Sequence, residues 1–293
     1  MPTDFSAQKG FTLIELMIAI TLGLLVSAAA LMIFLNSQRS LAIQGGMGEI
    51  DQNTIFGLNR LTRDLRHINL DTNTAHISIG GINSGIIFDV SQSPAVTIPA
   101  TAVSLANANA GLYDTQSDQL TIQYTTRNDT TDCEGNATPA DTRVVQRYYV
   151  DALPANQQSG SDVRYGLYCD AIWNGSAINA NQTVIIPDVE IFKVSLLTRN
   201  FNNTVADRTD DTLRYQTLGE YIAGSTGNTV ISLEVGVVMR SSNSVHADRN
   251  IDLTRPFNIA GHEVKLTNTT GSARFLRMPI NQVVAIRNAQ GLV

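Results

Sequence analysis

The sequence predicts an α+β protein in which one long N-terminal helix packs on antiparallel β-sheet. Three observations lead to this fold class. An uncharged apolar run lies near the N-terminus, a helical stripe of apolar side chains follows it, and short segments rich in Val, Ile, Tyr and Thr fill the rest. A chain of 293 residues with a terminal anchor leaves roughly 220 residues, enough for one globular domain or two small ones.

The apolar run Leu16–Leu35 contains no charged residue. As a helix it would span roughly 30 Å, which matches the hydrocarbon core of a bilayer. Only ten residues precede the apolar block that begins at Phe11. A conventional secretory signal is cut at small residues after its apolar stretch, whereas the small residues at 27–30 lie inside this one. We therefore expect the run to be retained as a membrane anchor.

One carboxylate, Glu15, interrupts the apolar block 11–35. An ionised side chain at bilayer depth costs at least about 2.5–3.5 kcal/mol, so Glu15 needs a partner there. A cut between Gly10 and Phe11 would place a new α-amino group four residues before Glu15. That amine, on a neighbouring copy, is one candidate counter-charge. Alternatively, Glu15 lies in the headgroup zone, where a carboxylate suits the start of a helix; the two interpretations are compatible.

The string KGFTLIELM at 9–17 resembles the class III signal of type IV pilins and type II secretion pseudopilins. The resemblance implies a type IV pilin-like fold and cleavage after Gly10 by a prepilin peptidase. It also implies methylation of the new N-terminal residue, Phe11, and a role for Glu15 in docking into a growing fibre. The N-terminus therefore predicts an assembling subunit.

The helix is predicted to continue beyond the membrane segment as an amphipathic helix. Gly45, Gly46 and Gly48 each cost up to about 1 kcal/mol relative to alanine there, and mark either a flexible joint or close helix packing. The stripe that would pack on a sheet contains Ile43, Met47, Ile50, Leu58, Leu61, Leu65 and Ile68. The expected segments are a leader (1–10), a transmembrane and filament-core helix (11–35), an amphipathic helix (36–70) and a β-rich globular domain (71–293).

Nine strands are predicted in that domain from their β-branched and aromatic content. Polar loops are expected at 91–118, 127–142 and 200–228. The predicted strands are His76–Ile79, Ile86–Val90, Gln119–Thr125, Arg143–Val150, Arg164–Cys169, Thr183–Ile186, Val189–Thr198, Val230–Arg240 and Phe275–Arg287.

The chain has two cysteines, Cys133 and Cys169. A lone pair in an exported chain most often forms one disulfide in an oxidising compartment. It would close a loop of about 37 residues and contribute roughly 3–4 kcal/mol on the loop-entropy model. The alternative is a pair of buried free thiols.

No residue pattern predicts an enzyme, a cofactor or a metal site. The histidines His67, His76, His246 and His262 lack metal-ligand spacing. The acidic cluster Asp207, Asp210 and Asp211 is interpreted as a solvated loop, with calcium as the alternative because several type II secretion pseudopilins bind it in loops. A net charge of −6 without a long basic run disfavours nucleic acid as the main ligand.

Two further segments refine the resemblance. The pattern Phe56, Leu58, Leu61, Arg63, Asp64, Leu65 and Arg66 resembles the helix of a minor pilin of type IV pili. Residues 283–291, VVAIRNAQG, resemble the last strand of such minor pilins and of J-type pseudopilins. A domain of this size is also similar to that of a scarce minor pilin rather than an abundant major one.

The resemblance implies a single-pass protein of the inner membrane with its domain in the periplasm, and later a place in the pilus fibre at the cell surface. The implied partners are other minor pilins, the major pilin, the prepilin peptidase, the inner-membrane assembly platform and a tip adhesin. The implied roles are pilus biogenesis, twitching motility, adhesion and DNA uptake. A J-type pseudopilin of a type II secretion system, or a membrane-anchored module that binds DNA or a surface ligand, are the alternatives.

Overall fold

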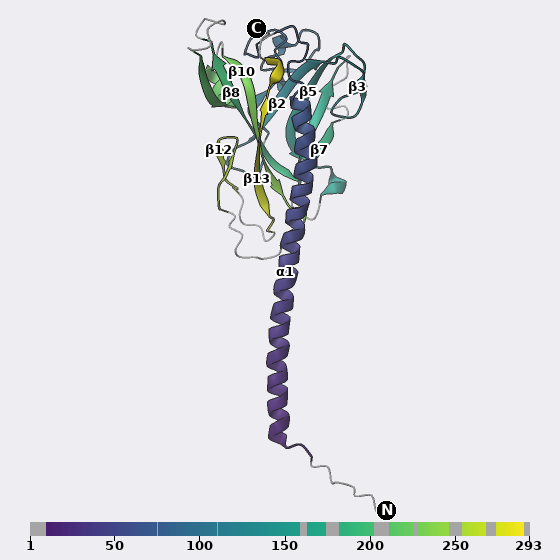
Figure 1. The fold of residues 1–293 in the computed structure, drawn as a ribbon, viewed down its shortest axis with the longest axis vertical. Coiled ribbons are helices and arrows are strands. Elements are labelled where there is room, and N and C mark those ends of the chain that lie inside the picture. The colour runs from purple at the N-terminus through teal and green to yellow at the C-terminus, as the bar shows by residue number, and fades with distance from the viewer. Residues whose placement is uncertain are drawn as a thin grey trace, which may run out of the picture. The chain divides into compact units, whose positions relative to one another are not determined.

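The computed structural model describes residues 10–74, 76–109, 111–158, 163–173, 182–201, 211–224, 228–245, 254–267 and 274–289. The α-helices of this part of the chain are α1 (Leu13–Leu65) and α2 (Leu218–Gly224) (Figure 1). The longer strands are β1 (Leu105–Asn109), β2 (Ser117–Thr125), β5 (Arg143–Ala152), β6 (Tyr165–Ile172), β7 (Thr183–Pro187), β8 (Val189–Asn200), β9 (Thr212–Thr217), β10 (Thr229–Arg240) and β13 (Arg277–Ala285). Two small hairpins are formed by β3 (Thr130–Thr131) with β4 (Ala137–Thr138), and by β11 (Phe257–Ile259) with β12 (His262–Val264).

The chain divides into two compact units between Gly45 and Gly46. The first unit contains the apolar part of α1, the one helix of the described chain that is long and apolar enough to cross a membrane. Its large side chains from Leu13 to Leu35 are exposed. An apolar surface of this extent is suited to lipid or to other apolar helices rather than to water.

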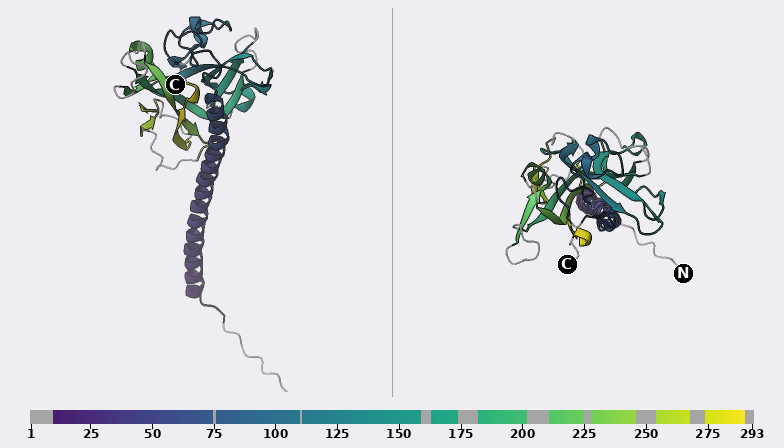
Figure 2. Two further views of the ribbon diagram at one scale, coloured as in Figure 1. Left: turned by 45° about the horizontal axis from the view of Figure 1, so that its top comes forward. Right: turned by 90° about the horizontal axis from the view of Figure 1, so that it is seen from above.

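The second unit, Gly46–Val293, contains two antiparallel sheets. One has the strand order β1-β2-β5-β6-β7 and the other β13-β10-β8-β9. Each neighbouring pair of strands is antiparallel, and the right-hand view of Figure 2 shows the sheets from above. The predicted α+β class, a long N-terminal helix packed on antiparallel sheet, is confirmed.

The C-terminal half of α1 packs on the sheets through the predicted stripe. Ile50, Leu61 and Leu65 are at most 1% exposed and share one core with side chains of both sheets. Gly57 brings the helix against β7, because a Cβ there would lie 2.4 Å from Cγ1 of Ile186. Met47, in contrast, is 45% exposed and Ile43 is half-buried, so the fully buried stripe begins at Ile50, about two turns later than predicted.

The helix ends at Leu65, five residues before the predicted end at residue 70. Asn69 and Asp71 have positive φ angles of 65° and 48°, which a right-handed helix does not accommodate. The Asn69 side-chain amide donates to the carbonyls of Thr74 and Asn288, which holds this turn against the C-terminal part of the chain. Ile68 is nevertheless buried, as the stripe predicted.

Two of the predicted strands, His76–Ile79 and Ile86–Val90, are wrong. Ile77, Ile86 and Ile87 are buried, but Ile86 forms only an isolated bridge to Ile122. The Gln92 side chain accepts from the Phe88 and Asp89 backbone nitrogens and ends the extended segment. The apolar side chains of these two segments are therefore buried without strand pairing, which explains why their composition resembles that of a strand. In the other direction, loops expected at 91–118 and 200–228 contain β1, β9 and α2.

Candidate functional site

The N-terminal site is built on the first turn of α1. The Glu15 carboxylate accepts hydrogen bonds from the backbone nitrogen and the hydroxyl of Thr12, each at 2.9 Å. The Glu15 nitrogen in turn donates to the Thr12 hydroxyl at 3.3 Å. This reciprocal pair is a capping box, which satisfies backbone donors that a helix start leaves unpaired.

The sequence signal for this cap is the spacing Thr-x-x-Glu at Thr12–Glu15. It adds a contact to the helix dipole and the partner in another copy that are expected for Glu15 from the sequence. In the structure Glu15 also has a partner within its own chain. This partner does not neutralise the charge, because a threonine hydroxyl and a backbone amide are both neutral.

The Gly10–Phe11 peptide bond lies just before this cap. Gly10 is exposed and has open space around it, and the Phe11 side chain is 93% exposed. The bond is therefore sterically open to an enzyme. Residues 1–9, most of the predicted leader, lie outside the described residues.

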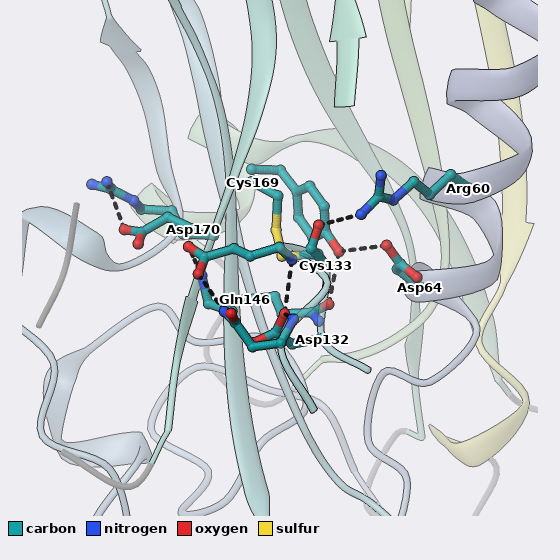
Figure 3. Close-up of a disulfide and its surroundings, with 12 residues drawn as sticks. Arg60, Asp64, Asp132, Cys133, Gln146, Cys169 and Asp170 are labelled. Carbon is teal, nitrogen blue, oxygen red and sulfur yellow. Dashed lines mark hydrogen bonds and ion pairs between the residues drawn. A yellow bond between two sulfur atoms is a disulfide. The ribbon is translucent and has the colours of Figure 1, made fainter. Parts of the chain in front are cut away.

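In the globular unit Cys133 and Cys169 form a disulfide with their Cα atoms 6.1 Å apart (Figure 3). It joins the β3–β4 hairpin loop to strand β6, and both residues are at most 2% exposed. The Arg60 guanidinium on α1 donates to the Cys133 carbonyl. The disulfide and this contact together connect the helix, the hairpin and the larger sheet.

The loop around Cys133 is held by its own aspartate. Asp132 accepts from the backbone nitrogens of Glu134 and Asn136, both at 2.9 Å, and from the Trp173 indole at 3.0 Å. A carboxylate that accepts this many hydrogen bonds fixes the conformation of the loop. It therefore stabilises the wall of the cavity next to it.

That cavity, of about 660 Å³, lies between the last turns of α1 and the end of β2 with the loop that follows it. Arg60, Arg63 and Asp64 line it from the helix, and His67 lines it from the turn that follows. Burial raises the pKa of Asp64 to about 6, against the opposing charge of Arg60 and a Tyr148 hydroxyl 3.3 Å away. Burial and the charge of Arg63 lower the pKa of His67, which favours its neutral form.

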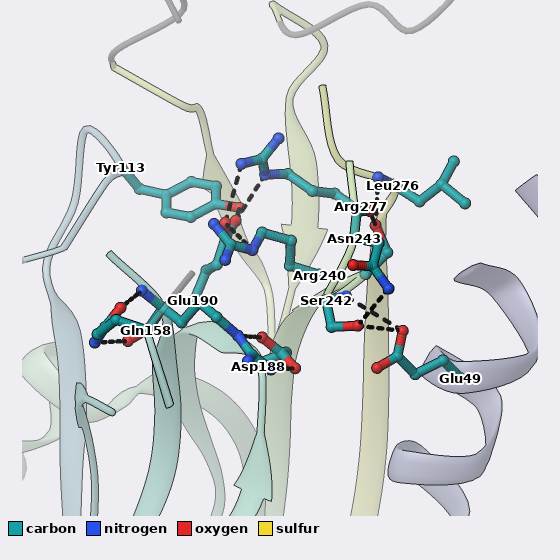
Figure 4. Close-up of polar contacts among 12 residues, drawn as sticks. Glu49, Tyr113, Gln158, Asp188, Glu190, Arg240, Ser242, Asn243, Leu276 and Arg277 are labelled. Carbon is teal, nitrogen blue, oxygen red and sulfur yellow. Dashed lines mark hydrogen bonds and ion pairs between the residues drawn. The ribbon is translucent and has the colours of Figure 1, made fainter. Parts of the chain in front are cut away.

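A buried ionic cluster joins three strands of the second sheet (Figure 4). Glu190 on β8 is 2.7 Å from Arg277 on β13 and 3.6 Å from Arg240 on β10, and it accepts from the Tyr113 hydroxyl at 2.7 Å. On α1, Glu49 accepts from the Ser242 hydroxyl at 2.7 Å. Buried charges of this kind need such pairing, and here the pairs connect elements far apart in sequence.

The described residues contain no group of three or more His, Cys, Asp or Glu that could hold a metal ion. Of the candidate acidic loop, Asp207 and Asp210 lie outside the described residues, and Asp211 accepts from Arg199 Nε at 2.6 Å. His246 also lies outside, while His67, His76 and His262 come from separate elements.

Comparison with protein families matches residues 5–31 to the prokaryotic N-terminal methylation motif. A comparison with curated proteins found no match. Among solved structures the chain is similar to the type IV-like pilin TTHA1219 from Thermus thermophilus, at 10% identity and a TM-score of 0.37, over 82% of this chain and 97% of that one. The chain thus begins with the methylation motif of prepilin-type proteins, followed by an exposed apolar helix that fits a membrane anchor.

Proposed function

We propose that this chain is a minor pilin of a type IV pilus, similar to PilW. The observation that carries the proposal is the methylation motif at residues 5–31, which continues into an apolar helix with a single carboxylate at its start. This arrangement suits a subunit whose helix is first anchored in a membrane and later packs against the helices of other subunits. The PilW-like pattern from Phe56 to Arg66, at the C-terminal end of α1 and in the residue after it, supports the finer assignment.

In this proposal a prepilin peptidase cuts between Gly10 and Phe11 and methylates the new Phe11 amine. The apolar helix of the processed chain anchors it in the inner membrane, with the globular unit in the periplasm. On assembly, the apolar helices bundle in the fibre. The Glu15 carboxylate then pairs with the Phe11 amine of a neighbouring subunit, which offsets the cost of burying either charge.

The role within the pilus follows from the size of the globular unit. A domain of more than 200 residues favours a scarce subunit that primes assembly and remains near the tip. Its partners would be other minor pilins, the major pilin, the assembly platform and a tip adhesin. Loss of the chain would then reduce piliation, and with it twitching motility, adhesion and DNA uptake.

The test is to shear surface filaments from cells and probe them for this chain. We expect a small amount of the chain in the filament fraction, and none when the prepilin peptidase gene is deleted. Deleting the chain should reduce the number of filaments. A different pair of results would support a J-type pseudopilin, to which residues 283–291 are similar. In that case filaments would be normal in number and lack the chain, and secretion through a type II system would require it.

A further inference from the structure

The cavity beside the disulfide loop has the size of a small-molecule site. Its volume of about 660 Å³ lies within the roughly 300–1,000 Å³ typical of ligand pockets. Its walls come from α1, the end of β2, the β2–β3 loop and the β3–β4 hairpin, which the disulfide and the Arg60 contact hold together. It is therefore bounded by braced elements.

The lining of the cavity is polar and balanced in charge. It contains three arginines and three aspartates: Arg60, Arg63, Arg127, Asp64, Asp129 and Asp132. Thr126, Thr130, Thr131 and Asn128 add hydroxyl and amide groups. Arg60, Arg127 and Asp132 already have partners in the protein, so an apolar ligand would leave chiefly Arg63 and one Asp129 oxygen unpaired. An ion of either sign would meet like charges in the lining.

Several of these groups keep hydrogen-bonding capacity for a ligand. Arg63 is exposed and forms no hydrogen bond or ion pair with any other residue that the structure describes. Asp129 uses one carboxylate oxygen to accept from the Ala140 nitrogen, at 2.9 Å. The Tyr124 hydroxyl accepts from Gln146 at 3.0 Å, which leaves its own proton free to donate. Donors and acceptors are thus available in the same cavity.

A sugar suits this combination, because each hydroxyl both donates and accepts a hydrogen bond. Guanidinium groups donate to such hydroxyls and carboxylates accept from them. The His67 and Tyr124 rings, with centroids 5.4 Å apart, and Leu70 add a small apolar area for the C–H face of a sugar ring. A long polyanion is disfavoured by the three aspartates and by the net charge of −6.

We propose that this cavity binds a neutral sugar residue, with Arg63 donating to its hydroxyls and Asp129 accepting from them. The inference goes beyond the proposed function and does not depend on processing or assembly. A glycan on a surface that the protein meets would be the natural source of such a ligand.

The full chain can be tested in lauryldimethylamine oxide, a detergent without a sugar headgroup. It would be applied to an array of neutral oligosaccharides of glucose, galactose, mannose and N-acetylglucosamine, with sialylated and polyglutamate spots beside them. The best neutral oligosaccharide would then be titrated against tryptophan fluorescence. Trp173, the single tryptophan of the chain, reports on the site because its indole donates to the cavity residue Asp132.

We expect saturable binding of a neutral oligosaccharide, weakened about tenfold by Arg63→Gln, the effect of losing a hydrogen bond to a charged donor. Asp129→Asn retains an oxygen for the Ala140 nitrogen and should also weaken binding. The matched control is Arg66→Gln, an exposed arginine of the same region that does not line the cavity and should leave affinity within about twofold.

Three results would overturn the proposal. The first is the absence of saturable binding to every neutral oligosaccharide on the array. The second is retention of sialylated or polyglutamate spots alone, which would make the cavity an anion site. The third is equal weakening by Arg63→Gln and Arg66→Gln, which would place binding outside the cavity.

Discussion

The Glu15 carboxylate and the Thr12 backbone nitrogen lie 2.9 Å apart and close a capping box at the first turn of α1. Glu15 can therefore do two separable things. It caps its own helix, which a neutral amide can also do, and it carries a negative charge, which only a carboxylate provides. The proposed pairing with a neighbouring amine depends on the charge alone.

Replacing Glu15 with Gln should separate these roles. We expect Glu15→Gln to retain the helix cap and membrane insertion but to reduce recruitment into filaments as strongly as Glu15→Ala. The physical reason is that the amide leaves a neighbouring Phe11 amine without a counter-charge. The measurement is the fraction of the chain in sheared filaments relative to the membrane fraction.

The matched control is Thr12→Ala, which removes the hydroxyl of the cap and keeps the charge. It should cost the helix start about 1 kcal/mol and leave recruitment largely intact. If Glu15→Gln assembles normally while Thr12→Ala does not, the cap rather than the charge is what assembly requires.

The Cys133–Cys169 disulfide should account for a large share of the stability of the globular unit. Its sequence separation of 36 residues predicts a loss of about 3–4 kcal/mol when both cysteines are replaced by serine. Urea denaturation followed by far-ultraviolet circular dichroism would measure this loss. Reductant should destabilise the unmodified chain to a similar extent and leave the double variant unchanged; a reductant-insensitive unmodified chain would contradict the prediction.

Asp64 should make stability depend on pH. Burial raises its pKa from the ordinary 3.8 to about 6, so the folded chain holds this proton more tightly than the unfolded chain does. Ionisation of Asp64 therefore lowers the free energy of unfolding as pH rises from about 4 through 6. We expect Asp64→Asn to stabilise the chain by about 1–2 kcal/mol at pH 7.5, and by less at pH 4.

This pH effect can be checked by urea denaturation at both pH values. Asp51→Asn, an exposed aspartate on the same helix, is the matched control and should change stability little at either pH. A stabilisation by Asp64→Asn that is the same at pH 4 and pH 7.5 would show that burial of the charge is not its cause.

Gly57 should be required for the packing of α1 on β7. A Cβ at this position would lie 2.4 Å from a side-chain carbon of Ile186, so Gly57→Ala should destabilise the fold by about 1–3 kcal/mol despite the better helix propensity of alanine. Gly48 is the control, since open space surrounds its Cβ position and alanine there should stabilise the helix by up to about 1 kcal/mol. Thermal unfolding of both variants would test the contrast, and equal effects would contradict it.

The sequence predicted most of α1 and the sheet class because both depend on local patterns. Ile50, Leu61 and Leu65 follow the helical period and are buried as expected. The central strands β5, β8 and β10 are long and β-branched, and their approximate positions were predicted. The candidate residues Glu15, Cys133 and Cys169 were also evident, because each is a rare residue type in its setting.

The features of the fold and of the cavity that the sequence did not predict depend on contacts between distant segments. Strand β9 has four exposed residues at its start and pairs only because β8 lies beside it, so its polar composition resembles a loop. Ile77 and Ile86 are of a residue type that strands favour, but both are buried in the core outside any strand. The cavity is equally invisible in sequence, since Arg63 and Asp129 are brought together only by the packing of α1 against the β2–β3 loop.

Mass spectrometry of the N-terminal peptide of the chain, purified from cells with an active prepilin peptidase, tests the central claim most directly. The account predicts a peptide that begins with N-methylated Phe11 and retains the apolar helix. The same chain from cells without the peptidase should still begin in the leader, before Gly10. A peptide that still carries the leader in peptidase-positive cells, or one that begins after the small residues at 27–30, would contradict the account.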